Sequence, residues 1–286
     1  MSEGDGTITW RQIWHDTSAL HTRVQARWLC EEASGAFGEE FDEVLDLPVT
    51  ERSVGHLDAM LARLRTGEPL QYVLGHWSFR HLDLLVDRRV LIPRPETEWV
   101  AEVALQLAAT MPRPCRCADL GTGSGALGLS LLHELPRGAA EVWLTDLDSD
   151  ALDVARANAA GIGIAGAGAR FGLGSWWAAL PADLRGTFSL VVSNPPYIAD
   201  DDPAVEPAVR DWEPARALYA GADGLHAVRA VAAGAGEWLA PGGWLVLEIG
   251  TGQGQAVHAL LEAAGLRDVE VRPDLAGHDR VALARR

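Results

Sequence analysis

The 286-residue chain has few cysteines, and its histidines are scattered along its length. Cys30, Cys115 and Cys117 cannot all pair, and the C-x-C spacing lacks a second pair of ligands at the separation of a metal site. We therefore interpret the three as reduced core thiols. No H-E-x-x-H arrangement occurs among the nine histidines, so the sequence predicts no metal site.

The sequence also lacks long apolar runs and an excess of positive charge. No uninterrupted apolar stretch approaches the roughly 18 residues of a membrane helix. The first ten residues, MSEGDGTITW, lack the basic and apolar regions of a secretion signal, which predicts a cytoplasmic protein. With 40 acidic and 24 basic residues the net charge is -16, which works against binding a polyanion. We expect a protein or small-molecule substrate, with no direct binding of nucleic acid and no membrane contact.

Apolar residues at helical spacing characterise the first part of the chain, and we predict a helical N-terminal domain over residues 1–74. Stripes of this kind form a core far more often than a ligand site. The expected core residues are Trp10, Ile13, Trp14, Leu20, Val24, Trp28, Leu57, Met60, Leu61 and Leu64.

Residues 71–92 switch toward alternation, with Trp77 and Phe79 before a turn and Leu82 and Leu84 after it. This pattern predicts a β-hairpin, and we assign residues 75–92 to a connector between two domains.

Strand-like and helix-like segments alternate in the rest of the chain, residues 93–286. Pro95 stands at a plausible first helical position. The predicted strands are CRCADL, EVWLTD, ARFGLG, FSLVVS and GWLVLEIG, and helical segments such as ALGLSLLHEL and SDALDVARANAA separate several of them. Alternation of this kind builds an α/β fold, in which helices cover both faces of a mainly parallel sheet. Ligands of such sheets bind at the carboxyl ends of the strands.

A glycine loop follows the first of these strands, and an acid, Asp146, ends the next strand. Glycines permit a tight turn and close approach of a ligand, while a helix N-terminus offers free N–H groups to an anion. The letters GSGALG at 123–128 also spell the dinucleotide fingerprint, so the loop alone is ambiguous. Asp119 favours S-adenosylmethionine, because an acid there could meet a ligand ammonium beside a carboxylate on the loop amides. The candidate cofactor-binding residues of this region are Asp119, Gly121, Thr122, Gly123, Ser124, Gly125 and Asp146.

The stretch Asn194-Pro195-Pro196-Tyr197 follows the strand FSLVVS, where two prolines could simply end the strand. A second interpretation is chemical. A planar amide or aromatic amine nitrogen is a poor nucleophile, and the Asn194 side-chain oxygen and the Pro195 carbonyl could accept both N–H bonds of an NH2 group. Tyr197 could stack on the planar group while the prolines restrict the loop. We therefore predict Asn194, Pro195 and Tyr197 as catalytic residues and all four as substrate-binding residues, with Asn194 also against the cofactor.

In this order and spacing, the glycine loop, Asp146 and NPPY resemble the class I S-adenosylmethionine-dependent methyltransferases that act on nitrogen. More specifically, the chain resembles the bacterial release-factor glutamine methyltransferases, the HemK family. The resemblance covers most of the chain from about residue 65. It rests on GEPLQYVLG, LIPRPETE, DLGTGSGALGLSL, SDALDVARANA, SNPPYI, WEPARALYAGADGL, LAPGGWLVLEIG and DLAGHDRVALAR.

The resemblance implies a Rossmann-like methyltransferase fold and the methylation of the glutamine in the Gly-Gly-Gln motif of peptide-chain release factors. S-adenosylmethionine would be the donor and S-adenosylhomocysteine the product, and the helical N-terminal domain would help to grip the protein substrate. Trp176 would flank the adenine. The polar side chains of PRPETE would help to close the site, or Arg94 and Glu96 would form a salt-bridged helix start. Ser175 stands where the family usually has an acid, so the adenine amine loses a charged neighbour.

Other functions stay open at this point. A related enzyme methylates a glutamine of a ribosomal protein, and adenine-amine methyltransferases on DNA or RNA share the N-P-P-aromatic chemistry. A NAD-binding oxidoreductase would explain GSGALG but leaves NPPY without a role. A noncatalytic cofactor-binding module would explain the fold alone.

Overall fold

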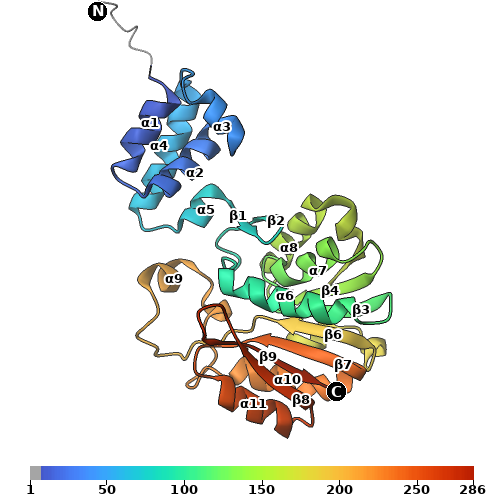
Figure 1. Ribbon diagram of the computed structural model, residues 1–286. Helices are drawn as coiled ribbons and strands as arrows, with labels where there is room; N and C mark the ends of the chain where they lie inside the picture. The colour runs from blue at the N-terminus through green and yellow to red at the C-terminus, as the bar shows by residue number, and fades with distance from the viewer. Residues whose placement is uncertain (1–7) are drawn as a thin grey trace, which may run out of the picture. The chain divides into compact units, whose positions relative to one another are not determined.

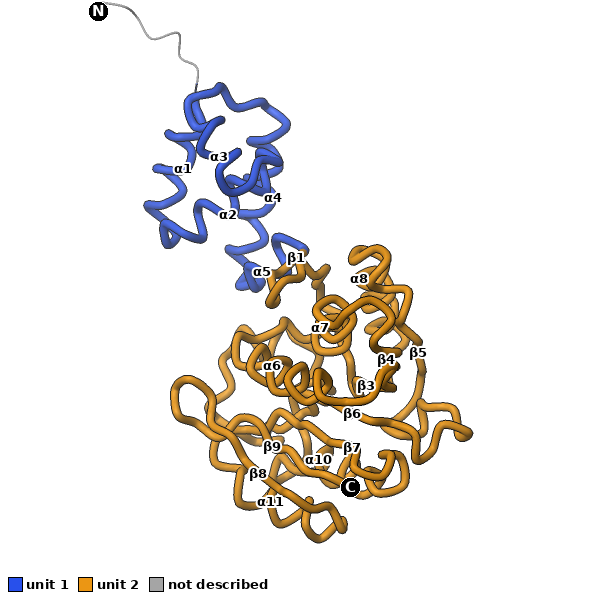
Figure 2. The backbone as a smooth tube through the Cα atoms, turned by 45° about the vertical axis from the view of Figure 1, so that its right-hand side comes forward, with its two compact units in different colours: residues 1–75 blue, residues 76–286 orange. Residues whose placement is uncertain are grey.

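The computed structural model describes residues 8–286, and the chain divides into two compact units, residues 1–75 and 76–286. Figure 2 draws the two units in blue and orange. No helix within the described range has the length and apolar character that crossing a membrane requires.

The first unit is helical, as predicted, and contains α1 (Trp10–Ser18), α2 (Arg23–Ser34), α3 (Glu39–Val44), α4 (Glu51–Arg65) and α5 (Leu70–Leu74) (Figure 1). Thr22 caps α2 by accepting a hydrogen bond from the backbone N–H of Gln25, and the Gln25 side chain accepts one from the Thr22 backbone in return. The core of the unit is built from the side chains of Trp10, Leu29, Cys30, Ala33, Phe41, Leu45, Leu57, Met60 and Val73.

One predicted core stripe is wrong. Leu20, Val24 and Trp28 are exposed, with 75%, 55% and 37% of their surfaces accessible. Helix α2 instead buries Ala26, Leu29, Cys30 and Ala33, which repeat at the same helical spacing on another face. The spacing could not decide between two apolar faces of one helix.

The chain around residue 75 also differs from the prediction. Residues 71–74, which we expected to begin the alternating segment, belong to helix α5 (Leu70–Leu74). This helix ends at Gly75, whose φ of +83° is left-handed. The predicted hairpin follows, with β1 (His76–Phe79) antiparallel to β2 (Leu82–Leu85) and Trp77 opposite Leu84.

A seven-stranded sheet forms the centre of the second unit, in the order β5-β4-β3-β6-β7-β9-β8. Five neighbouring strands are parallel, as predicted: β5 (Ala169–Leu173), β4 (Ala140–Asp146), β3 (Cys115–Leu120), β6 (Phe188–Ser193) and β7 (Leu239–Glu248). The hairpin of β8 (Arg267–Pro273) and β9 (Asp279–Arg285) joins β7 antiparallel, and the sequence analysis did not predict it.

Helices cover both faces of this sheet, which confirms the predicted fold class (Figure 1). Helices α6 (Pro95–Ala109), α7 (Ala126–Glu134) and α8 (Ser149–Gly161) lie on one face, and α10 (His226–Trp238) and α11 (Gly254–Ala263) on the other. The short helix α9 (Pro207–Trp212) belongs to the long connection after β6. Strands β4 and β5 extend the sheet on one side of β3, and β6 and β7 extend it on the other. This reversal of strand order opens a crevice at the carboxyl ends of β3 and β6.

Arg80, in the turn of the β1–β2 hairpin, fastens the hairpin to two helices. Its guanidinium donates to both carboxylate oxygens of Glu134 on α7, at 2.7 and 2.8 Å, and to Glu102 on α6 at 2.9 Å. The side chain is 13% exposed. Its removal would leave the Glu134 carboxylate, which is 16% exposed, without its cation, while Glu102, at 37%, stays better solvated.

We expect Arg80→Met to lower the free energy of unfolding by about 2 kcal/mol, since breaking a largely buried ion pair costs more than breaking an exposed one. The matched control is Arg272→Met, because Arg272 pairs with its strand neighbour Glu270 at the surface and its loss should cost below about 1 kcal/mol. Urea unfolding of both variants measures the difference. Equal losses would show that Arg80 does not fasten the hairpin.

Candidate active site

The glycine loop between β3 and α7 forms the floor of the site. Gly121, Gly123 and Gly125 all have positive φ, at +72°, +54° and +90°. Gly128, one turn into α7, packs directly on the sheet: a Cβ there would lie 3.1 Å from the Asp119 side chain and 3.2 Å from Leu144. Its missing side chain therefore brings the start of α7 against β3 and β4.

Asp119 at the end of β3 is 1% exposed and holds the loop from inside. Its Oδ2 accepts hydrogen bonds from Thr122 Oγ1 at 2.6 Å and from the Gly128 backbone N–H at 2.9 Å. Burial raises the pKa of Asp119 to about 6. No described residue donates to Oδ1, so one oxygen of this cavity-lining carboxylate stays available to a cationic ligand group.

Asp146 lies at the end of β4, beside the same loop. Its Oδ2 accepts from the Gly123 backbone N–H at 3.0 Å, and its Oδ1 accepts from the Asp148 N–H at 2.9 Å. Burial raises the pKa of this carboxyl group as well. Because a carboxylate oxygen has more than one lone pair, these two contacts leave Asp146 able to accept the hydroxyl groups of a ribose.

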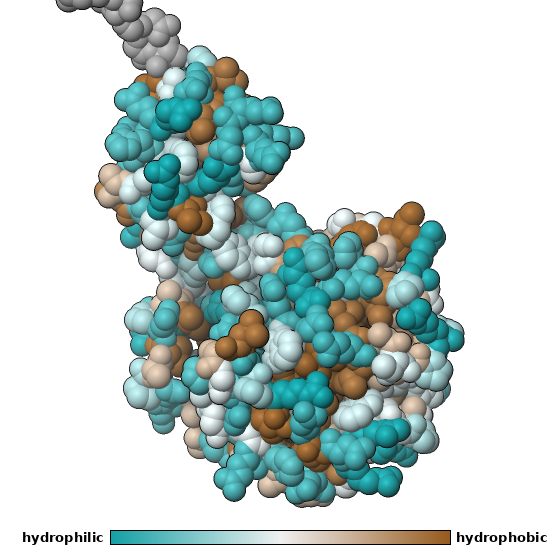
Figure 3. All heavy atoms as spheres, in the orientation of Figure 1, coloured by the Kyte–Doolittle hydropathy of each residue, from teal (hydrophilic) through white to brown (hydrophobic). Residues whose placement is uncertain are grey.

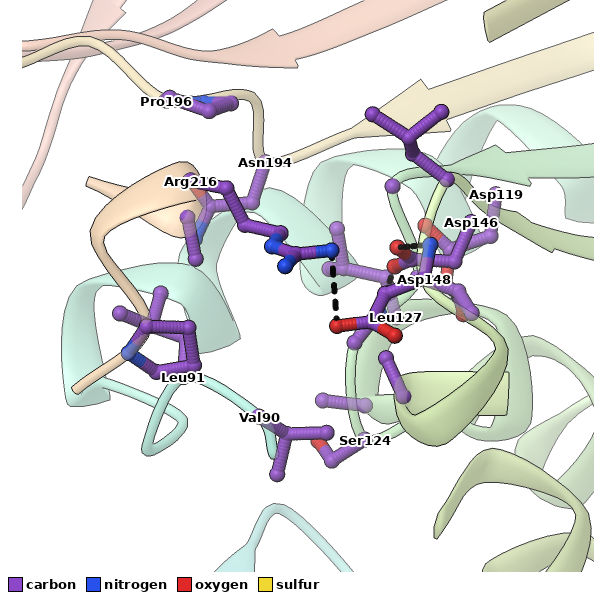
Figure 4. A pocket seen from close by; sticks show the side chains of 18 of the residues that line it. Val90, Leu91, Asp119, Ser124, Leu127, Asp146, Asp148, Asn194, Pro196 and Arg216 are labelled. Carbon is purple, nitrogen blue, oxygen red and sulfur yellow. Dashed lines mark hydrogen bonds and ion pairs between the residues drawn. The ribbon is translucent and has the colours of Figure 1, made fainter. Parts of the chain in front are cut away.

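A cavity brings most of the predicted cofactor residues together (Figure 4). Trp176 closes one side with its ring over the glycine loop, since a Cβ on Gly121 would lie 3.4 Å from a ring carbon. The next residue, Trp177, is instead part of the core and stacks on Trp238 at 6.1 Å. The predicted residues that line the cavity are Asp119, Gly121, Thr122, Gly123, Ser124, Asp146, Trp176, Asn194 and Pro196. Gly125 lies outside that lining and caps the start of α7.

A second cavity adjoins the first at the NPPY segment. Asn194 lines both cavities, whereas Pro196 lines only the first and Tyr197 only the second. Pro195 is buried, and no described residue donates a hydrogen bond to its carbonyl oxygen. The structure therefore places Asn194 between a space beside the glycine loop and a separate space beside Tyr197.

Two buried residues form a hydrogen-bonded chain behind Asn194. The sequence analysis included Thr97 only among the polar side chains of PRPETE and did not predict Glu248. Thr97 on α6 accepts a hydrogen bond from Asn194 Nδ2 at 3.3 Å and donates one from its own hydroxyl to Glu248 at 2.6 Å. The other carboxylate oxygen of Glu248 accepts from the Tyr197 hydroxyl at 3.2 Å. Glu248 is the one acid in the apolar strand sequence LVLE, and this could have marked it as a candidate. The sequence does not show which residues it bonds, because Thr97 and Tyr197 lie far away along the chain.

Ion pairs hold the segment between β6 and α10 beside the two cavities. Arg94 pairs with the buried Glu213, which also accepts from the Ile92 backbone N–H at 3.0 Å. Arg216 reaches across the first cavity to Asp148 at 3.1 Å (Figure 4). Arg94 is therefore paired with a distant segment and does not form the salt-bridged helix start considered above.

Burial raises the pKa of Glu248 to about 7, with the cation of Arg280 opposing the shift and Glu96 adding to it. A carboxyl group whose pKa is raised by folding binds its proton more tightly in the native state, so its contribution to stability falls as the pH rises toward the raised pKa. We expect the stability of the wild type relative to Glu248→Gln to fall by about 2 kcal/mol between about pH 5 and pH 8. Urea unfolding at both pH values measures this difference, and a constant difference would contradict the burial of a titrating carboxyl group.

The chain is similar to known methyltransferases. Residues 103–210 match the family model described as methyltransferase small domain. A methyltransferase from Pyrococcus furiosus has the same fold, with a TM-score of 0.52 and 16% identity over 79% of this chain and 96% of that chain.

Two curated relatives are much more similar in sequence. The release factor glutamine methyltransferase of Xylella fastidiosa (strain Temecula1) is 44% identical over 241 residues, which cover 84% of each chain. The release factor glutamine methyltransferase of Burkholderia pseudomallei is 44% identical over 262 residues, covering 91% of this chain and 90% of that one. With this identity extending over most of both chains, the protein belongs to the family of release factor glutamine methyltransferases.

Proposed function

We propose that this protein transfers a methyl group from S-adenosylmethionine to the side-chain amide nitrogen of the glutamine in the Gly-Gly-Gln motif of peptide-chain release factors. The observation that carries this proposal is the position of Asn194. It stands at the end of β6 between the cavity of the glycine loop and the cavity of Tyr197, in a chain that belongs to this enzyme family. We infer a cytoplasmic location, because release factors act on ribosomes there.

The residues of the first cavity fit S-adenosylmethionine, which supplies an electrophilic methyl group on a sulfonium. Asp146 can accept the ribose hydroxyls, and Trp176 offers a ring face to the adenine. The free Oδ1 of Asp119 suits the ammonium of the amino-acid end, while the loop amides suit its carboxylate. Ser175 lines this cavity and can donate or accept one hydrogen bond, but it offers the adenine amine no charge.

Asn194 Oδ1 and the Pro195 carbonyl are the two acceptors that we assign to the glutamine NH2. Neither accepts a hydrogen bond from a described residue, so both remain available to a substrate. Holding both N–H bonds favours a pyramidal nitrogen whose lone pair faces the methyl group, and it stabilises the positive charge that develops there. The protonated methylamide is acidic enough to lose its proton to water, so the scheme requires no general base. Positioning and electrostatics then provide most of the rate.

We propose that the helical N-terminal domain predicted over residues 1–74, which lies within the first unit, binds the release factor. Its exposed apolar residues include Leu20, in the turn before α2, and Val24 and Trp28, one turn apart on α2. An apolar stripe of this kind on a small unit suits contact with a protein surface. The NPPY site would then receive the glutamine loop of a substrate that is held elsewhere.

The assignment is tested by incubating the protein with labelled S-adenosylmethionine and an intact release factor, followed by mapping of the label by mass spectrometry. We expect label on the glutamine of Gly-Gly-Gln and none on the Gly-Gly-Ala variant. Equal labelling of the two substrates would contradict the proposed acceptor, and label only on ribosomal proteins or nucleic acid would assign a different substrate.

Asn194→Ala removes one of the two proposed acceptors, so we expect turnover to fall by well over about tenfold while cofactor affinity stays largely intact. Methyl-transfer kinetics and calorimetry with S-adenosylmethionine measure the two quantities. Unchanged turnover would exclude the acceptor role.

Asp146→Ala should weaken cofactor binding, unlike Asn194→Ala, because the Asp146 carboxylate is assigned to the ribose of the cofactor. We expect the dissociation constant for S-adenosylmethionine to rise by about tenfold or more, since hydrogen bonds to a charged group contribute roughly 1.5–3 kcal/mol. Calorimetry measures this constant, and an affinity equal to that of the wild type would remove Asp146 from the cofactor site.

The docking role is tested by Leu20→Ser combined with Val24→Ser. We expect kcat/KM to fall about fivefold or more on the intact release factor and to stay unchanged on a short Gly-Gly-Gln peptide, because only the intact protein reaches the first unit. The matched control is Ile164→Ser, since Ile164 is a similarly exposed apolar residue, 64% accessible, of the second unit. Equal losses on protein and peptide would argue against docking through this stripe.

A further inference from the structure

Thr97 and Glu248 form a buried polar pair behind Asn194. Thr97 is 3% exposed and Glu248 is 0% exposed. The Thr97 hydroxyl donates to Glu248 Oε2 at 2.6 Å, and the Tyr197 hydroxyl donates to Oε1 at 3.2 Å. Both oxygens of this carboxylate are therefore occupied by hydroxyl groups that belong to or adjoin the NPPY segment.

The pair fixes the direction of the hydrogen bonds. A threonine hydroxyl has one proton, and Thr97 donates it to the ionised carboxylate of Glu248, which can only accept. The threonine oxygen therefore has only lone pairs left for its other neighbour. That neighbour is the Asn194 side chain at 3.3 Å, which must present its NH2 group to Thr97. The amide oxygen, Oδ1, is then left on the other side of the amide for a substrate.

This direction matters because an asparagine amide is nearly symmetrical in shape. Packing alone discriminates poorly between its two orientations, and only hydrogen bonds choose between oxygen and nitrogen. With the amide reversed, Asn194 would turn N–H donors toward the N–H donors of the glutamine, and the acceptor that holds the nucleophile would be lost.

We propose that Thr97, itself oriented by Glu248, is a positioning residue that holds the Asn194 amide with its oxygen toward the nitrogen to be methylated. The inference rests on the proposed function, because it takes Asn194 as the acceptor for the glutamine NH2. Thr97 acts through Asn194 and has no separate step in the methyl transfer.

The placement of Glu248 supports this role. Its strand neighbours Leu245, Val246 and Leu247 are all 0% exposed, and an unpaired carboxylate in such surroundings costs several kilocalories per mole. Arg280 lowers that cost as a nearby cation and is itself only 8% exposed. The two hydrogen bonds that Glu248 accepts therefore come from Tyr197 of the NPPY segment and from Thr97, which contacts Asn194 of the same segment.

The test compares Thr97→Val with Thr97→Ser in single-turnover methylation of an intact release factor at saturating S-adenosylmethionine and about pH 8, where the Glu248 carboxylate is ionised. We expect Thr97→Val to slow the methyl transfer by about tenfold, because the amide loses its fixed orientation, and Thr97→Ser to stay within about threefold of the wild type. The cofactor dissociation constant should change by less than about threefold in both variants. Ser130→Ala, which removes a 0% exposed hydroxyl that bonds only within α7, is the matched control and should leave the rate unchanged.

A double-mutant cycle separates positioning from a general structural effect. If Thr97 acts through Asn194, adding Thr97→Val to Asn194→Ala should change the rate by less than about twofold. A full tenfold loss in the Asn194→Ala background, or an unchanged rate for Thr97→Val alone, would overturn the inference. Should Thr97→Val fail to fold, Thr97→Ala removes the same hydroxyl with less bulk and takes its place in the cycle. A wild-type protein that methylates no release factor would overturn the proposed function and this inference together, whereas an active wild type with an unaffected Thr97→Val overturns the inference alone.

Discussion

The short hydrogen bond from Thr97 to Glu248 is the interaction on which the geometry of the site depends. It joins the start of α6 to the end of β7 and sets which way Asn194, at the end of β6, presents its amide. A buried carboxylate destabilises the fold unless its oxygens are satisfied, and here two hydroxyl groups satisfy them. The same bonds that favour the ionised form of Glu248 against the effect of burial therefore also order the NPPY segment.

The first cavity depends on a different constraint, the close packing of α7 on the sheet. Gly128 permits this packing, and Asp119 ties the glycine loop to the helix through one carboxylate oxygen. The loop and the NPPY segment end neighbouring strands, β3 and β6, where the order of the strands reverses. Cofactor and acceptor groups thus meet at one edge of the sheet, and Asn194 adjoins both cavities.

The sequence predicts those parts of the site whose residues are contiguous, namely the glycine loop and NPPY, together with the alternation that builds the parallel sheet. It could not predict the pair of Thr97 and Glu248, because 151 positions separate them and only the folded sheet brings them together. Helix α2 shows a second limit, since apolar residues repeat at helical spacing on two of its faces and only packing selects the buried one. Strand β8 was missed because most of its residues are polar and it lies at the edge of the sheet.

The most direct measurement is a neutron crystal structure of the deuterium-exchanged protein, which locates the exchangeable hydrogens of these side chains. In crystals at about pH 8, where Glu248 is ionised, we expect deuterium on Thr97 Oγ1 directed at Glu248, and the two deuterium atoms of Asn194 on the side that faces Thr97. A Thr97 hydroxyl directed at Asn194, with the asparagine nitrogen turned toward the cavities, would contradict the proposed orientation.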